Sequence, residues 1–255
     1  MPGTVNLIAP GQVDDAATQA RRDGRWAWLV RRIWPSRCLL CGEAGHLGRD
    51  LCAACTRQLP WNSSACARCA VPLPPLADAS TRTCGACLRR PPPQAACRAA
   101  FVYGFPLDRL LPRAKFHGDL AAARLLAGLM AQACGDAGRP DAIVPLPLHP
   151  ARLRQRGFDQ ALELARPLAR ALVLPLRPDL LLRRRDTAPQ SRLDAAQRRR
   201  NLHDAFGVPS GAVLPAHVAL VDDVMTTGAT LHSAAGALRR AGVARVDGWV
   251  CARVP

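Results

Sequence analysis

The sequence predicts an α/β protein in which a parallel sheet covered by helices is preceded by a small cysteine-rich module. Three observations support this fold class. Four Cys-x2-Cys pairs fall within residues 38–87, strand-like and helix-like segments alternate from residue 97 onward, and no apolar run reaches the roughly 18 residues of a membrane span. With 255 residues and 49% hydrophobic side chains, the chain can form one or two domains with their own cores.

The charge is strongly basic and comes almost entirely from arginine. The formal net charge is +16, and the chain has 34 arginines but a single lysine, Lys115. This balance favours a polyanionic partner, either nucleic acid or a phosphorylated small molecule. A coding bias toward G and C would produce the same composition, so charge alone does not select DNA. Aromatic residues make up only 4%, which argues against a broad base-stacking platform.

The amino-terminal segment carries no export pattern. It lacks a charged stretch followed by an apolar one, so we expect a cytoplasmic protein. Residues 1–37 are expected to form a mobile tail and a short amphipathic helix over 25–37, which would pack on the protein or, alternatively, lie on a membrane surface. We expect a metal-binding module over 38–93, closed by a proline-rich stretch, and an α/β domain over 94–255.

The cysteine pairs indicate metal rather than disulfides. Two thiolates separated by two residues can bind one tetrahedral zinc ion, and two such pairs complete a closed structural site. Four pairs predict two zinc ions, with sequential pairing expected and an interleaved arrangement left open. Such sites hold a module together and do not perform chemistry. The predicted ligands are Cys38, Cys41, Cys52, Cys55, Cys66, Cys69, Cys84 and Cys87.

The α/β part is read from apolar periodicity. Strands are expected over residues 97–105, 142–147, 180–183, 205–208, 218–221 and 243–251, and helices over 108–115, 118–134 and 157–172. In a parallel sheet, ligands bind beyond the carboxyl ends of the strands. The chemistry-bearing residues of this chain should therefore follow strands.

The stretch 218–230, VALVDDVMTTGAT, has this arrangement. An apolar run is followed by Asp222 and Asp223 and then by a Thr/Gly turn that opens a helix. Backbone N–H groups at a helix start lack intrahelical partners and favour an anion, so the turn is a candidate phosphate cradle. Two adjacent carboxylates repel each other and would be relieved by ribose hydroxyls or metal-bound water. The alternative is an ordinary strand-turn-helix with capping threonines.

A second candidate stretch, PLPLHPARLRQRGFDQ over 145–160, brings Arg152, Arg154 and Arg156 in front of Gly157. Guanidinium groups can bind phosphate oxygens while the glycine allows close backbone approach. Pyrophosphate would fit such a stretch, although a solvated basic helix start is the simpler interpretation.

Together these motifs resemble a known family. VALVDDVMTTGAT is similar to the phosphoribosyl-pyrophosphate (PRPP) loop of type I phosphoribosyltransferases. The cysteine pairs beginning with CLLCG, then RAKFHGD, PLPLHPARLRQRGFDQ, RRRDTAPQSRLDAAQRRRNL and LVDDVMTTGAT follow the order of the competence protein F (ComF) family, from about Pro35 to the carboxyl terminus. Asp159 stands where that family usually has asparagine, and we expect it to cap the following helix.

The resemblance implies a type I phosphoribosyltransferase domain behind a double zinc ribbon, with PRPP or another ribose phosphate and Mg²⁺ as ligands. By resemblance, Asp222, Asp223 and Lys115 are the catalytic candidates. The implied PRPP-binding residues are Val221, Asp222, Asp223, Met225, Thr226, Thr227, Gly228, Ala229, Thr230, Arg152, Arg156 and Gly157. A flexible loop closing over PRPP would include Arg183, Arg185, Thr187, Gln190, Arg198 and Asn201.

Three functions follow from these features. The first is an enzyme that transfers a phosphoribosyl group to an acceptor the sequence does not name, or a protein that binds PRPP without turning it over. The second is a single-stranded-DNA-binding adaptor of natural transformation, in which the arginine-rich loop tracks the DNA backbone. The third is a zinc-stapled scaffold that docks other competence proteins.

Overall fold

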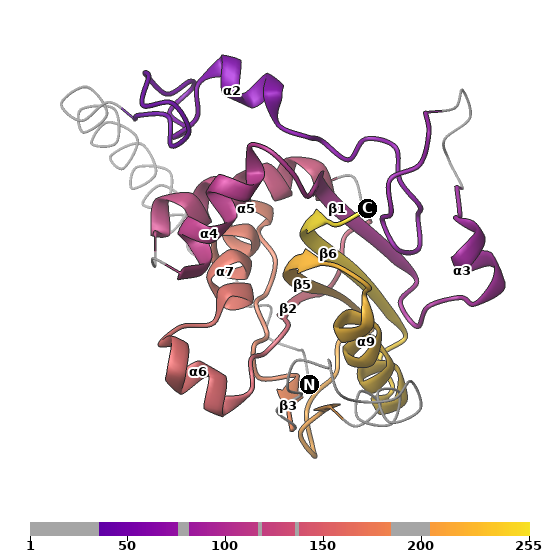
Figure 1. The fold of residues 1–255 in the computed structure, drawn as a ribbon. Coiled ribbons are helices and arrows are strands. Elements are labelled where there is room, and N and C mark those ends of the chain that lie inside the picture. Colours follow the sequence, from indigo (N-terminus) through magenta and orange to yellow (C-terminus); the bar gives the residue numbers. More distant parts are fainter. Residues whose placement is uncertain (1–35, 76–81, 117–118, 136–137, 185–204) are drawn as a thin grey trace, which may run out of the picture. The chain divides into compact units, whose positions relative to one another are not determined.

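The computed structural model describes residues 36–75, 82–116, 119–135, 138–184 and 205–255 (Figure 1). The chain divides into two compact units between Thr56 and Arg57, so the division falls between the second and third cysteine pairs. The predicted tail and helix over 1–35 lie outside the described residues. Within the described parts of the chain, no helix is both long and apolar enough to cross a membrane.

The larger unit is built on a parallel sheet. Its strands are β1 (Ala96–Val102), β2 (Ala142–Pro145), β5 (His217–Met225) and β6 (Arg245–Arg253), and they lie in the order β1-β6-β5-β2. All three pairings are parallel. The helices are α2 (Ala53–Gln58), α3 (Gly85–Arg89), α4 (Leu107–Phe116), α5 (Leu120–Cys134), α6 (Pro150–Arg156), α7 (Gln160–Leu172) and α9 (Ala229–Ala241). The parallel α/β fold class is thus confirmed.

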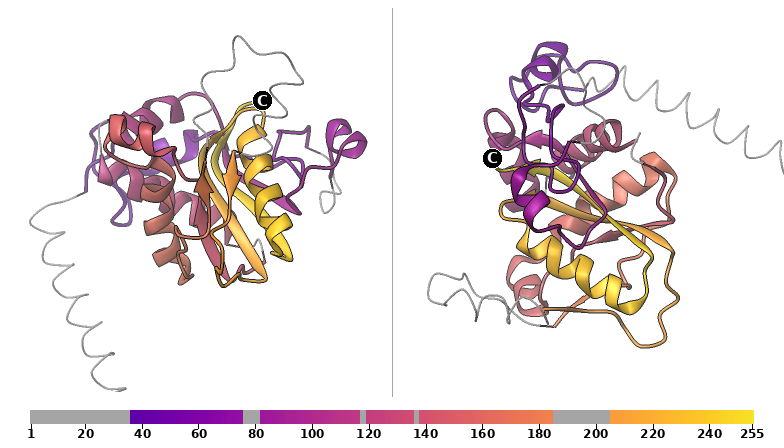
Figure 2. Two further views of the ribbon diagram at one scale, coloured as in Figure 1. Left: turned by 90° about the horizontal axis from the view of Figure 1, so that it is seen from below. Right: turned by 90° about the vertical axis from the view of Figure 1, so that its right-hand side faces the viewer.

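Helices cover both faces of the sheet (Figures 1 and 2). Helices α5 and α7 pack on one face, with Leu126 and Leu168 fully buried, and α9 packs on the other through Leu231 and Leu238. Residues 218–221 of the central strand β5 and 249–252 of β6 are apolar and buried on both sides, as expected in a covered parallel sheet. Burial of these side chains is the main source of the stability of this unit.

Three elements differ most from the prediction. The expected helix over 157–172 begins later, as α7, because Gly157 adopts a left-handed conformation (φ 79°) that ends the preceding helix α6, and Asp159 then caps α7. The expected strands over 180–183 and 205–208 are only β3 (Leu182–Arg183) and β4 (Phe206–Gly207), which form a separate antiparallel pair. Short apolar runs do not reveal which sheet they join.

The segment after Arg57 belongs to the sheet and not to a free module. The backbone N–H of Asn62 donates to the carbonyl of Ala100 (3.0 Å), and that of Val102 donates to the carbonyl of Pro60 (2.8 Å). The ring centroids of Trp61 and Phe101 are 4.7 Å apart. This segment therefore covers the outer edge of β1, where unpaired backbone groups would otherwise be open to solvent.

Candidate functional site

The acidic pair lies inside β5 and not beyond its end. The prediction ended this strand at Val221, where its pairing with β2 stops, at Pro145. On the other side, β6 continues alongside, and Asp222 pairs in register with Val250. The strand boundary was wrong because pairing with β6 supports four further residues, through Met225. One edge of β5 is thus free of β2 at the carboxylates, and successive side chains point to opposite faces.

Lys115 supplies the counter-charge of this pair. Its Nζ lies 2.8 Å from Oδ2 of Asp223, and the two side chains are 24% and 16% exposed. Lys115 stands in the last turn of α4, so this helix brings the one lysine of the chain to the sheet. An ion pair with this little exposure is screened less than a surface pair, and the loss of either partner leaves a poorly solvated charge.

Asp222 has no such partner, and its pKa is raised to about 8. Burial is the largest cause, followed by the negative charge of Asp223. The backbone N–H of Asp223, which donates to Oδ1 of Asp222 at 2.9 Å, and the charge of Lys115 oppose this rise. At neutral pH, Asp222 therefore holds its proton for most of the time. A cation or a pair of hydroxyl groups at this point would favour the ionised form.

The Thr/Gly turn leads directly from the carboxylates into α9. Gly228 has φ 79° at the helix start, a conformation that favours glycine, and the N–H of the next residue, Ala229, donates to Oγ1 of Thr227 at a long 3.4 Å. A Cβ at position 228 would lie 2.3 Å from Cε of Met225 and 2.9 Å from Nε2 of His232, so these two side chains would have to move. Thr226 and Thr227 are exposed. Amides at a helix start lack intrahelical partners, and the role of this turn as a phosphate cradle stays a prediction.

The basic stretch follows β2, the neighbour of β5 in the sheet. Arg154 and Arg156 lie on α6 and are exposed, and Arg152 is half-buried. Because β2 and β5 are parallel neighbours, the segments after both strands leave the same edge of the sheet. Gly157 has a positive φ that favours glycine, and a Cβ at this position would meet no atom within 4 Å, so the expected close approach of a ligand to its backbone stays a prediction.

The helix-capping role of Asp159 is confirmed. Its Oδ1 accepts from the N–H of Leu162 at 3.1 Å, and its Oδ2 accepts from the N–H of Leu148 at 3.0 Å. The carboxylate that departs from the family pattern therefore has backbone donors of its own. Its charge also contributes to the raised pKa of Asp222, which locates the start of α7 near the acidic pair.

Most of the predicted flexible loop lies outside the described residues, including Arg185, Thr187, Gln190, Arg198 and Asn201. Arg183 is described: it belongs to β3, and its guanidinium carbon lies 5.5 Å from the ring centre of Phe206. Such a cation–π contact holds the start of the loop against the short antiparallel pair.

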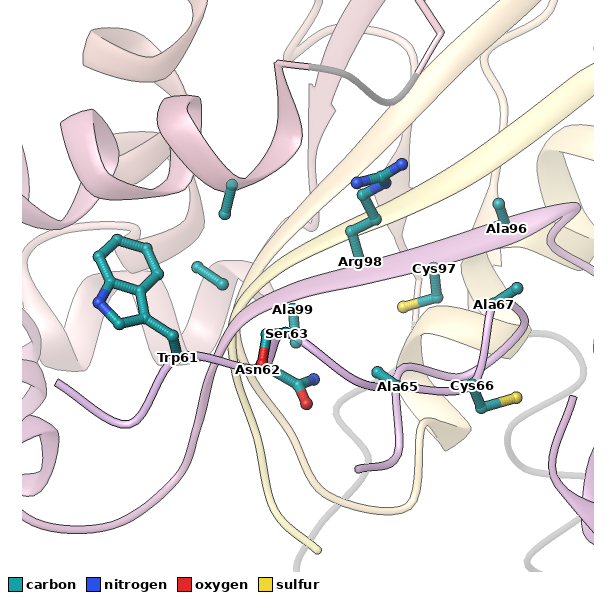
Figure 3. Close-up of a pocket in the computed structure, with 12 residues that line it drawn as sticks. Trp61, Asn62, Ser63, Ala65, Cys66, Ala67, Ala96, Cys97, Arg98 and Ala99 are labelled. Atoms are coloured by element: carbon teal, nitrogen blue, oxygen red, sulfur yellow. The ribbon is translucent and has the colours of Figure 1, made fainter. Parts of the chain in front are cut away.

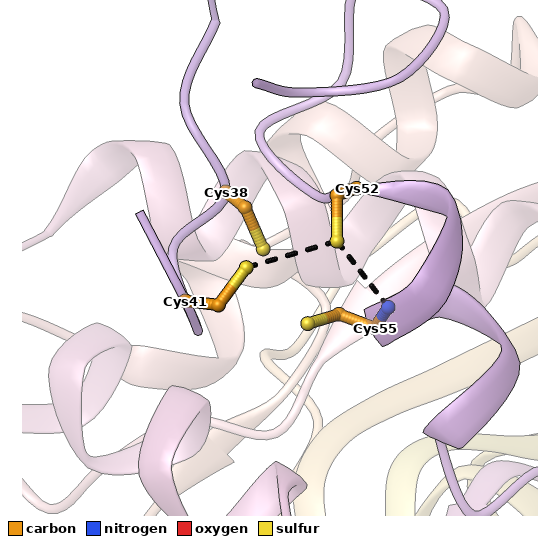
Figure 4. A group of neighbouring side chains, drawn as sticks. All are labelled: Cys38, Cys41, Cys52 and Cys55. Carbon is orange, nitrogen blue, oxygen red and sulfur yellow. Dashed lines mark hydrogen bonds between the residues drawn. The ribbon is translucent and has the colours of Figure 1, made fainter. Parts of the chain in front are cut away.

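The eight paired cysteines form two tetrads in sequential order, as predicted. The first tetrad contains Cys38, Cys41, Cys52 and Cys55 (Figure 4), and the second contains Cys66, Cys69, Cys84 and Cys87. Within each tetrad all sulfurs lie within 4.8 Å of one another. The sulfurs of Cys41 and Cys52 are 3.7 Å apart, as are those of Cys69 and Cys84. Sulfurs at 2.3 Å from a tetrahedral zinc are about 3.8 Å apart, so both tetrads fit a structural zinc ion.

In each tetrad one cysteine thiol has a lowered pKa. Burial raises the pKa of Cys38, but backbone N–H groups, first that of Cys52, lower it to about 6. In the second tetrad burial is again opposed by backbone N–H groups, first that of Cys84, and the pKa of Cys66 is lowered to about 7. Donors directed at sulfur stabilise the thiolate that a metal requires.

A cavity of about 420 Å³ lies apart from the acidic pair, between residues 61–67 and β1 (Figure 3). Trp61 and Arg98 line one part of it, and Cys66 and Cys97 line another. It borders the second tetrad and the edge of the sheet, whereas the ligand chemistry predicted from sequence gathers at the end of β5. The cavity and the predicted ligand-binding residues therefore lie in different parts of the larger unit.

Sequence reasoning missed two residues that support the turn. His232 lies under Gly228, and its pKa is lowered, first by burial and then by the charges of Arg253 and Arg90. Arg253 donates to the carbonyls of Cys69 (3.1 Å) and Met225 (3.3 Å). Arg253 ends a strand with no motif around it, so no local signal could have identified it.

The chain is similar to one domain family over its cysteine pairs and to several bacterial proteins over most of its length. Residues 29–88 match the double zinc ribbon domain family. The DNA utilization protein YhgH of Escherichia coli O157:H7 is 36% identical over 228 residues, which cover 86% of this chain and 97% of that protein. Competence protein F of Haemophilus influenzae is 35% identical over 226 residues, 85% of this chain and 96% of that protein.

Among solved structures, the glutamine PRPP amidotransferase from B. subtilis is similar with a TM-score of 0.39 and 19% identity. The match covers 55% of this chain and 30% of that one.

Proposed function

The chain belongs to the family of competence protein F and DNA utilization protein YhgH, and from this premise we propose that it binds PRPP with Mg²⁺ at residues 221–230. The observation that supports the proposal most is the trio of Asp222, Asp223 and Lys115, which precedes the turn that starts α9. It combines acceptors for two ribose hydroxyls with a cradle for the 5′-phosphate.

In this proposal each side chain of the trio has a distinct task. Asp223 is held by Lys115 and accepts a ribose hydroxyl. Asp222, whose pKa is raised to about 8 by burial and by Asp223, loses its proton when the second hydroxyl or a cation arrives. Mg²⁺ would neutralise the pyrophosphate of the incoming ligand. Thr226, Thr227, Thr230 and the amides of Gly228 and Ala229 would receive the 5′-phosphate.

The reaction that such a site can support is phosphoribosyl transfer. A nitrogen nucleophile forms a bond to the anomeric carbon, the bond from that carbon to the pyrophosphate oxygen breaks, and pyrophosphate leaves with the bonding pair. Arg152 and Arg156, on the segment that leaves the same sheet edge, are proposed to bind the departing group. The acceptor nitrogen is the open part of this proposal.

The test is titration calorimetry of zinc-loaded protein with PRPP, with and without Mg²⁺, beside the variant Asp222→Asn/Asp223→Asn. We expect magnesium-dependent binding that the double variant abolishes. Binding retained in the variant would refute the site assignment. Binding without turnover of any nitrogen acceptor would restrict the proposal to a PRPP-binding protein.

A second candidate function is single-stranded DNA handling, which is favoured by the net charge of +16 and by the similarity to a protein named for DNA utilization. Binding through phosphates predicts little sequence preference and a steep loss of affinity with salt. The replacement of Arg198, Arg199 and Arg200 by glutamine should reduce the salt slope. Single-strand affinity that is unchanged in this variant would argue against the DNA function.

A further inference from the structure

We propose that Arg253 is a positioning residue that couples the second cysteine tetrad to the Thr/Gly turn, so that the metal at this tetrad sets the geometry of the turn. The effect on a ligand rests on the PRPP site proposed above. The mechanical coupling rests on contacts within the larger unit and does not depend on that site.

The guanidinium of Arg253 joins three backbone segments. Its Nε donates to the carbonyl of Cys69 at 3.1 Å, and its Nη1 donates to the carbonyl of Met225 at 3.3 Å and also to that of Val254. Cys69 is a tetrad ligand, and Met225 is the last residue of β5, immediately before the turn. A metal that fixes the sulfur of Cys69 therefore also restrains the carbonyl that Arg253 holds.

A second route of contacts reaches the same methionine. The backbone N–H of Cys97 donates to the carbonyl of Ala67, between two tetrad ligands, at 2.8 Å. The thiol of Cys97 lies 3.8 Å from the sulfur of Met225. Figure 3 shows Cys97 of β1 beside the segment that carries Ala67 and Cys66. Both sets of contacts thus connect the tetrad segment 66–69 to Met225.

Met225 passes this restraint to the turn. A Cβ built on Gly228 would lie 2.3 Å from its Cε, so the methionine side chain lies directly beneath the glycine that starts α9. Val254 adds a backbone bond, with its N–H donating to the carbonyl of Met225 at 3.0 Å. The position of Met225 therefore determines where the first amides of α9 point, and these amides form the phosphate cradle.

Arginine has the geometry that this role requires. Its planar fork offers five N–H donors in fixed directions and can hold several carbonyls at once, whereas the ammonium of lysine is a point charge. The neighbouring Cys66, Cys69 and Cys87 are buried in one hydrophobic cluster with Cys97, Met225 and Leu231. A displacement of residues 66–69 therefore displaces close-packed atoms around the turn.

Ligand-free hydrogen exchange tests the coupling. In Arg253→Gln we expect the amides of residues 226–230 to exchange about tenfold faster than in the wild type, with two zinc ions per chain retained, and Arg253→Lys should restore part of the protection. The matched control is Arg245→Gln at the opposite end of β6, where the side chain pairs with Asp247 at 3.1 Å. Equal turn exchange in Arg253→Gln, Arg245→Gln and wild type would overturn the proposal.

Zinc release supplies a readout that does not require an arginine substitution. In the variant Cys52→Ser/Cys55→Ser only the second tetrad can retain zinc. By linkage, PRPP at the turn should slow chelator-driven zinc loss from this variant, and Arg253→Gln in the same background should abolish the protection. If PRPP protects zinc equally with and without Arg253, the coupling fails. If PRPP binds neither protein but turn exchange still depends on Arg253, the coupling stands and the proposed function fails.

Discussion

The second cysteine tetrad and the acidic pair each gather groups that repel one another when ionised, but they resolve the repulsion differently. The tetrad is closed, because four sulfurs at zinc-binding distances leave no open coordination position and sit within the core. The acidic pair is open, because its ammonium, that of Lys115, pairs with Asp223 and not with Asp222, and one edge of the strand is free of β2. We therefore expect the closed cluster to contribute to stability and the open cluster to bind a ligand.

Breaking the closed cluster should have the largest effect. Cys87→Ser removes a buried ligand from the second tetrad and leaves three thiols without their metal. We expect a loss of about 3–5 kcal/mol in the free energy of unfolding of the larger unit, similar to other losses of a structural metal or cross-link. Urea unfolding followed by tryptophan fluorescence measures it. A urea-unfolding curve equal to that of the wild type would show that the second tetrad does not contribute to stability, and the distinction between the two clusters would be lost.

Removal of the one counter-charge should have the next largest effect. In Lys115→Met, Asp223 keeps its charge without a partner, so we expect a loss of about 1–2 kcal/mol of stability and about tenfold in PRPP affinity. Arg177→Gln is the matched control, because Arg177 pairs with Asp179 on the surface, where the two side chains are 31% and 60% exposed. That change should stay within about 0.5 kcal/mol. Equal effects of the two variants would contradict a special role for Lys115.

Neutralising the open cluster should stabilise the free protein. The pKa of Asp222 is raised to about 8 by burial and by Asp223, whereas an unfolded aspartate ionises near pH 4. The wild type therefore loses stability as pH rises between these values, and the loss is complete above about pH 8. Asp222→Asn removes this loss, so we expect a gain of about 1 kcal/mol at pH 8 together with lost PRPP binding. A gain that shrinks as pH rises would contradict the raised pKa.

The smallest effect should come from the first tetrad. Cys52→Ser/Cys55→Ser lies in the other compact unit, so zinc content should fall from two ions to one while unfolding of the larger unit changes by less than about 0.5 kcal/mol. Metal analysis and urea unfolding of the same sample test both parts. A large loss in the free energy of unfolding of the larger unit would show that both tetrads stabilise this unit to a similar extent.

The elements that sequence predicted well depend on local patterns. Two residues between cysteines decide that both sulfurs can face one ion, and the order of Asp222, Asp223 and the Thr/Gly turn decides the local chemistry. The ion pair between Lys115 and Asp223 was harder to predict, since more than one hundred positions separate the two residues. Only the family resemblance directed attention to this lysine.

The features that sequence missed all depend on distant partners. Strand β5 extends to Met225 only because β6 lies beside it, and α6 and α7 separate because of the single positive φ at Gly157. Arg253 and Cys69 are 184 positions apart, and no periodicity relates them. The equal spacing within the cysteine pairs likewise gave no sign that the second tetrad is buried in the core of the larger unit.

The strand order has a consequence for synthesis on the ribosome. Strand β6 is made after β1, β2 and β5, yet it lies between β1 and β5, so the sheet cannot close until residues 245–253 have left the exit tunnel. Until then the inner edges of β1 and β5 lack their partner and could pair with other chains. The outer edge of β1 is protected much earlier, because residues 60–67, which cover it, are made before it. In a nascent chain the outer edge of β1 is thus covered early, and the sheet is completed when β6 inserts between β1 and β5.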